Sequence, residues 1–96
     1  MNYLVMIKIH RCVNITDTME PIMHELNEKF GLKDEYGVEI TKIEDIDVLY
    51  SNIYLNITTP SALCITGVIS SLLYRMIKMQ VGIYSVTTEE NTSCSH

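Results

Sequence analysis

The sequence has no charged residue between Val48 and Tyr74, although both flanks of this stretch are charged. Its first half alternates like a strand, and its second half has the spacing of a helix. A core accounts for one face of each element, yet the other faces carry Tyr, Asn, Ser and Gly instead of Lys and Glu. Charged side chains resist burial at interfaces, whereas aromatic and amide groups tolerate it, so the stretch indicates a contact surface.

Basic residues are scarce. Seven Lys and Arg stand against twelve Asp and Glu, which gives a formal net charge of -5. Nucleic-acid backbones are bound by Lys and Arg that neutralise phosphates, so this composition argues against duplex DNA as a partner.

The sequence also has few cysteines, no signal-peptide pattern and no long apolar run. Cys12, Cys64 and Cys94 have no disulfide-framework spacing, and residues 1–10 lack the pattern of a signal peptide. We therefore expect a cytoplasmic protein with reduced thiols. Polar residues interrupt the apolar part of 60–74, which is shorter than the roughly 20 residues that a bilayer requires. No membrane association is expected.

No catalytic pattern is present. The four glycines are scattered and form no phosphate loop, and Cys64 has no basic neighbour in sequence that would activate its thiol. His24 falls on the polar side of its predicted helix. We expect neither an enzyme nor a cofactor.

Four side chains have the chemistry of zinc ligands, namely His10, Cys12, Cys94 and His96. The predicted topology brings the C-terminal pair out near Tyr3, about 30 Å from Cys12 at the rise of a strand. This separation favours the absence of a metal site, and whether the four ever share a metal stays open.

The residues that are present predict six elements. Alternation predicts strands over 3–13, 36–43, 48–58 and 81–88, with Tyr3, Val5, Ile7 and Ile9 on the inner side of the first and Leu49, Ile53, Leu55 and Ile57 on that of the third. Helical spacing predicts a helix over 19–30, capped by Thr18 with Pro21 in its first turn, a Glu25–Lys29 pair and a stop at Gly31.

A second helix is predicted over 60–79, with Thr59 as its cap. Its buried stripe is expected to comprise Ala62, Ile65, Val68, Ile69, Leu72, Met76 and Met79.

This order, strand-helix-strand-strand-helix-strand, is typical of the α+β ferredoxin-like arrangement, a four-stranded antiparallel sheet with two helices on one face. It predicts a single α+β domain over 1–88 and a disordered polar tail over 89–96. The first and third strands are central in this arrangement. Their outward residues define what we call the open face: Leu4, Met6, Lys8, His10, Tyr50, Asn52, Tyr54 and Asn56.

An uncovered sheet with apolar members is a surface that monomers avoid, so the open face predicts a homodimer. Its tyrosines also fit a base-stacking platform for single-stranded nucleic acid or a small ligand. A third possibility is that the tyrosines are simply good strand formers beside water.

Acidic residues surround the second strand and define an acidic strip: Asp34, Glu35, Glu39, Glu44, Asp45 and Asp47. Such a strip discourages pairing between sheet edges, and it could also act as a decoy that mimics nucleic acid. The sequence thus predicts a non-enzymatic, homodimeric domain that regulates or inhibits a larger protein. Abundant isoleucine suggests an AT-rich coding source, consistent with a mobile element.

Overall fold

The computed structural model describes residues 1–30 and 36–91. Within these ranges the chain forms the strands β1 (Asn2–His10), β2 (Gly37–Asp45), β3 (Tyr50–Thr58) and β4 (Ile83–Glu90), and the helices α1 (Ile15–Phe30) and α2 (Cys64–Lys78). The element order is the predicted one.

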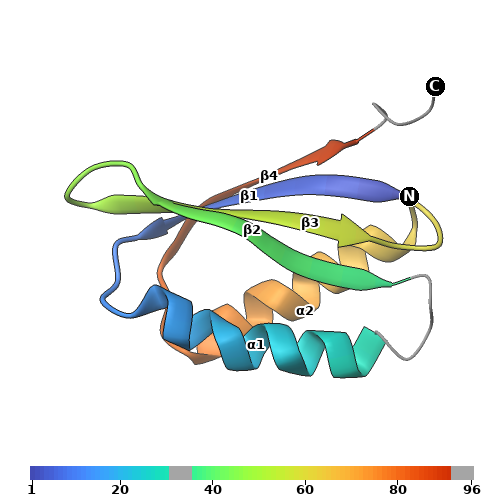
Figure 1. Cartoon of the computed structure of the whole chain (residues 1–96), viewed down its shortest axis with the longest axis horizontal. Helices are drawn as coiled ribbons and strands as arrows, with labels where there is room; N and C mark the ends of the chain where they lie inside the picture. Colours follow the sequence, from blue (N-terminus) through green and yellow to red (C-terminus); the bar gives the residue numbers. More distant parts are fainter. Residues whose placement is uncertain (31–35, 92–96) are drawn as a thin grey trace.

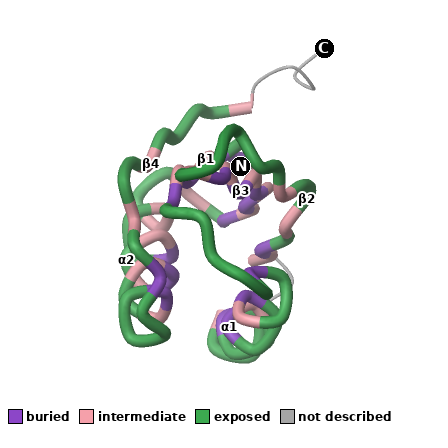
Figure 2. Tube along the Cα trace, turned by 90° about the vertical axis from the view of Figure 1, so that its left-hand side faces the viewer, coloured by how far each residue is buried: buried purple, intermediate pink, exposed green. Residues whose placement is uncertain are grey.

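The described strands form one antiparallel sheet in the order β2-β3-β1-β4, so the first and third strands are central (Figure 1). Both helices lie on the same side of the sheet, and no helix or strand of the described residues covers the opposite side (Figures 1 and 2). The ferredoxin-like prediction is therefore confirmed.

The core lies between the sheet and the helices. Val5, Ile7 and Ile9 from β1 and the residues Ile53, Leu55 and Ile57 from β3 are at most 1% exposed, as the alternation predicted. The helices contribute Met19, Leu26, Val68, Leu72 and Met76, each fully buried. Because the inward residues of both central strands are apolar, the helices pack on that side of the sheet.

Helix α1 begins four residues before its predicted start, because the apolar stripe extends further back. Ile15 is 8% exposed and lies one turn before Met19, so it adds an anchor to the buried face. Asn14 precedes the helix at a φ of 65°, and its carbonyl accepts the Thr18 amide. The predicted Thr18 cap is therefore wrong, and Pro21 lies inside the helix instead of in its first turn.

The predicted ion pair in α1 is replaced by contacts to α2. The Glu25 carboxylate pairs with Arg75 at 3.1 Å, and the Lys29 ammonium donates to the Ser71 hydroxyl. The predicted stop at Gly31 lies outside the described residues.

Helix α2 begins at Cys64, later than predicted, because Thr59 still belongs to the sheet side of the connection. The Thr59 amide donates to the Met1 carbonyl, the N-terminal amine donates to the Thr59 carbonyl, and the hydroxyl binds the Ser61 carbonyl. Thr59 is thus not the cap. Ala62 and Met79 were predicted to be buried but are exposed, since both lie outside the helix that packs on the sheet.

The strand ends also differ from prediction. β1 stops at His10, and Leu49 is 62% exposed because it lies in the turn before β3. β4 continues through Glu89 and Glu90, so these two residues belong to the domain and not to a tail. Among the described residues no helix has the length and apolar character needed to span a bilayer.

Candidate interaction surface on the uncovered sheet

The open face consists of directly opposed residues on β1 and β3. The register pairs Leu4 with Asn56, Met6 with Tyr54, Lys8 with Asn52 and His10 with Tyr50, so the structure brings all eight predicted residues together. The rings point away from the helices, because their neighbours Ser51, Ile53 and Leu55 occupy the buried side. The alternation in the sequence was sufficient to define this surface.

One end of the open face is hollow and apolar. A cavity of about 340 Å³ is lined by side chains from the sheet, among them Leu4, Met6, Thr41, Tyr54, Thr87 and Glu89. Leu4 is 46% exposed at this end. Because water contacts these apolar groups in the isolated chain, covering them would be favourable.

The other end carries an aromatic cluster formed by His10, Tyr50 and Tyr84. The Tyr50 ring lies 5.3 Å from the His10 ring and 5.2 Å from the Tyr84 ring, between centroids. The Lys8 ammonium lies over both tyrosines, 4.8 Å from the Tyr50 centroid and 5.1 Å from the Tyr84 centroid. Packing among these groups holds the rings together while leaving Tyr84 60% exposed.

Sequence reasoning missed Tyr84 because a bulge changes the register of β4. Ser85 pairs with Lys8 and Ile83 with Ile9, so Tyr84 is the extra residue between them. Simple alternation places Tyr84 and Ser85 on different faces of the sheet, whereas the Tyr84 ring contacts the open face. Thr41 was left out of the predicted open face because that face was defined from the two central strands alone. It is the extra residue where β2 shifts between Ile40 and Lys42.

A polar network crosses the middle of the open face. The Asn52 amide donates to the Tyr54 hydroxyl, which donates to the Glu44 carboxylate, and Lys42 pairs with Glu44 at 3.1 Å. Lys42, and to a lesser extent Tyr54, hold the pKa of Glu44 below its ordinary value because they stabilise its charged form.

Two amide oxygens on this surface lack donors. Asn52 Oδ1 and Asn56 Oδ1 are covered by neighbouring atoms and accept no hydrogen bond from the part of the chain that is described. A covered acceptor without a donor costs free energy, so these two amide oxygens leave part of the hydrogen-bonding capacity of the open face unused.

Gly82 allows β4 to approach the aromatic cluster. A Cβ at this position would lie 2.8 Å from His10 Cδ2, while the Gly82 carbonyl accepts the His10 amide at 2.8 Å. We expect Gly82→Ala to displace the His10 ring from Tyr50 and to lower stability by about 1 kcal/mol, in the range of a lost aromatic contact.

Thermal unfolding of Gly82→Ala in wild-type and His10→Ala backgrounds tests this expectation. The substitution should cost markedly less when the His10 ring is absent. An equal cost in both backgrounds would show that the ring is not what Gly82 accommodates.

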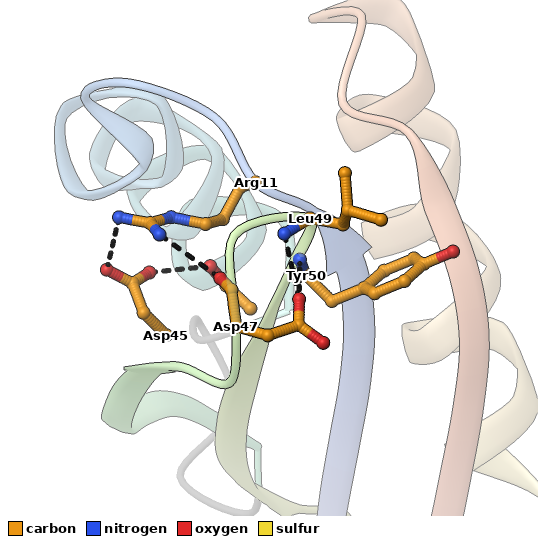
Figure 3. A network of polar contacts seen from close by, with 6 residues as sticks. Arg11, Asp45, Asp47, Leu49 and Tyr50 are labelled. Atoms are coloured by element: carbon orange, nitrogen blue, oxygen red, sulfur yellow. Dashed lines mark hydrogen bonds and ion pairs between the residues drawn. The ribbon is translucent and has the colours of Figure 1, made fainter.

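The acidic strip is dispersed, and most of its described members have partners within the fold. Asp45 pairs with Arg11 at 3.1 Å (Figure 3) and accepts the Ser51 hydroxyl. Asp47 Oδ1 accepts the Leu49 and Tyr50 amides (Figure 3). Glu44 belongs to the network above, Glu39 is exposed on β2, and Asp34 and Glu35 lie outside the described residues. These contacts involve Asp45 at the end of β2 and Asp47 in the β2–β3 connection, so both carboxylates are used within the fold.

Of the four candidate zinc ligands, only His10 and Cys12 lie within the described residues. Cys12 is exposed and its thiol contacts the Val13 carbonyl, while Cys94 and His96 lie outside the described ranges. Within the described ranges no three His, Cys, Asp or Glu residues gather in a way that could hold a metal ion.

No protein-family model matches the chain, and no curated protein matches it significantly. Solved structures do. The de novo designed protein Foldit4 is similar with a TM-score of 0.65 and 14% identity, over 95% of this chain and 99% of the design. The de novo designed protein Ferredog-Diesel is similar with a TM-score of 0.60 and 14% identity, over 94% and 85%.

A formyltetrahydrofolate deformylase from Pseudomonas putida KT2440 is similar with a TM-score of 0.55 and 9% identity. The match covers 96% of this chain but only 29% of that enzyme. At these identities the similarities define the fold class alone, which is ferredoxin-like.

Proposed function

We propose that this protein is a non-enzymatic interaction domain that forms a homodimer through its open face. The observation that carries the proposal is that the open face has an apolar hollow at one end and an aromatic cluster at the other. Interfaces are enriched in aromatic residues and methionine and depleted of charge at their centre, and Met6 opposite Tyr54 has this composition.

We further propose that the dimer regulates or inhibits a larger protein in the cytosol. Support comes from the outer side of α2, where Tyr74 and Ile77 are 59% and 62% exposed, and from Leu63 just before the helix, which is 90% exposed. Gly67 and Ser70 also lie in α2, which has no charged residue before Arg75. This uncharged helix surface is available for a second contact when the partner copy covers the open face.

Size-exclusion chromatography with light scattering tests the dimer. The wild-type protein should have twice the chain mass of 11.0 kDa. Leu4→Lys should weaken the dimer at least about tenfold, because it places a charge in the covered apolar hollow. Leu4 is already 46% exposed and lies beside Glu89, so the isolated fold tolerates the change.

Tyr74→Lys is the matched control, since Tyr74 is exposed to a similar extent on the opposite side of the molecule. It should leave the dimer intact. A monomeric wild-type protein would contradict the proposal. If that monomer also showed tyrosine fluorescence that titrates with oligonucleotide or nucleotide, the open face would be a ligand-binding platform instead.

A further inference from the structure

The two ends of the open face differ in shape. The hollow lies around Leu4 and Met6, whereas the aromatic cluster, with Tyr84 60% exposed, lies around Lys8 and His10. At the rise of an antiparallel strand, Leu4 and Lys8 are about 14 Å apart. The face thus offers a hollow and a group of bulky aromatic rings at a fixed spacing along β1.

The two ends also differ in charge. Lys8 lies over the rings of the aromatic cluster, and Glu89 lines the hollow, next to Leu4 in the register of β1 and β4. Neither Lys8 nor Glu89 forms an ion pair among the described residues. One end therefore carries an available cation and the other an available carboxylate.

A second copy can be placed on this face by either of two simple two-fold rotations. An axis along the strands sets like ends together, so that hollow meets hollow and Lys8 meets the partner copy's identical lysine. An axis across the strands reverses the partner, so that each aromatic cluster meets a hollow and each Lys8 meets a Glu89. Only the second rotation matches both shape and charge.

We infer that the dimer, which rests on the proposed function, packs its two sheets face to face with the strands reversed about an axis between the pairs Met6–Tyr54 and Lys8–Asn52. Each copy then seats its aromatic cluster over the hollow of the other. Two Lys8–Glu89 contacts form between copies, one on either side of the axis. A two-fold arrangement makes each contact twice, so a single substitution acts on both sides.

Charge reversal tests this arrangement. Lys8→Glu and Glu89→Lys should each weaken the dimer at least about tenfold, because each sets like charges opposite one another in both contacts. The double variant Lys8→Glu/Glu89→Lys should recover the wild-type dissociation constant to within about threefold, since it restores both attractive pairs. Sedimentation at a series of protein concentrations gives these constants.

Lys78→Glu on α2 and Glu20→Lys on α1 are matched controls that make the same charge changes on exposed helix positions. Both should leave dissociation unchanged. Thermal unfolding of every variant identifies any that lose the fold. If the double variant does not fold, an equimolar mixture of the two single variants provides the same attractive pairs and should form a heterodimer.

The outcomes separate the two proposals. A wild-type monomer contradicts the dimer itself. A wild-type dimer that Leu4→Lys disrupts but that single charge reversals leave unchanged overturns only the reversed arrangement. Loss of the dimer in both single variants without recovery in the double variant or in the mixture overturns it as well.

Discussion

Leu72→Ala is expected to lower the free energy of unfolding by about 3 kcal/mol, the typical cost of removing a fully buried leucine. Leu72 is 0% exposed and lies on α2 between Val68 and Met76, which are also fully buried. These three residues hold α2 against the sheet, while the outer side of the helix contributes little packing. Since domains of this size are stable by only about 5–15 kcal/mol, the loss is a large share of the total.

Leu63→Ala makes the same chemical change one residue before the same helix, where the side chain is 90% exposed. It should alter stability by less than about 0.5 kcal/mol. Both variants are compared by denaturant unfolding in the Leu4→Lys background, because dimer formation makes apparent stability depend on concentration. Equal effects of the two substitutions would mean that α2 does not pack as described.

The sequence was sufficient to predict the layers and the open face because both follow from local alternation. From Ile53 onward β3 alternates Ile or Leu with Tyr, Asn or Thr, and in β1 the inner residues Val5, Ile7 and Ile9 alternate with Leu4, Met6, Lys8 and His10. Shifting either strand by one residue would exchange the two sets. Once the two strands are central, their outward residues share one face, and the register places Met6 opposite Tyr54.

The helix starts were mispredicted because local signals competed with long-range contacts. Thr59 before Pro60 has the sequence of a cap, but the amide and carbonyl of Thr59 bind Met1, far away in the sequence. Pro21 suggested that the helix begins just before it, but burial of Ile15 extends the helix further toward the N-terminus. In both cases a tertiary contact outweighed the local preference.

The aromatic cluster and the hollow were the least predictable parts of the candidate site. Tyr84 reaches the aromatic cluster through a bulge in β4, and a bulge has no alternation of its own to reveal it. Thr41 lies on an edge strand, which the prediction from the central strands did not include. Glu89 was assigned to a tail because it begins a polar terminal stretch, whereas pairing with β1 retains it in the sheet.

Asp47→Ala is expected to destabilise the domain by about 1–2 kcal/mol, because it removes an acceptor shared by two backbone amides. The Asp47 carboxylate binds the Leu49 amide at 2.8 Å and the Tyr50 amide at 2.9 Å, which fixes the entry into β3. Arg11 reinforces the same connection, since its guanidinium donates to the Asp47 carbonyl at 3.1 Å. Loss of the side-chain acceptor should loosen the end of the sheet that carries Tyr50.

Asp47→Asn is the decisive comparison, since its amide oxygen can accept the same two hydrogen bonds without the negative charge. If Asp47 acts by holding the turn, Asn should retain most of the stability that Ala loses, as measured by thermal unfolding. If the acidic strip instead acts by its charge, as a decoy of nucleic acid would, Asn and Ala should weaken binding to a basic partner equally. Stability lost equally in both variants would contradict the role in the turn, because the retained acceptor would then have no effect.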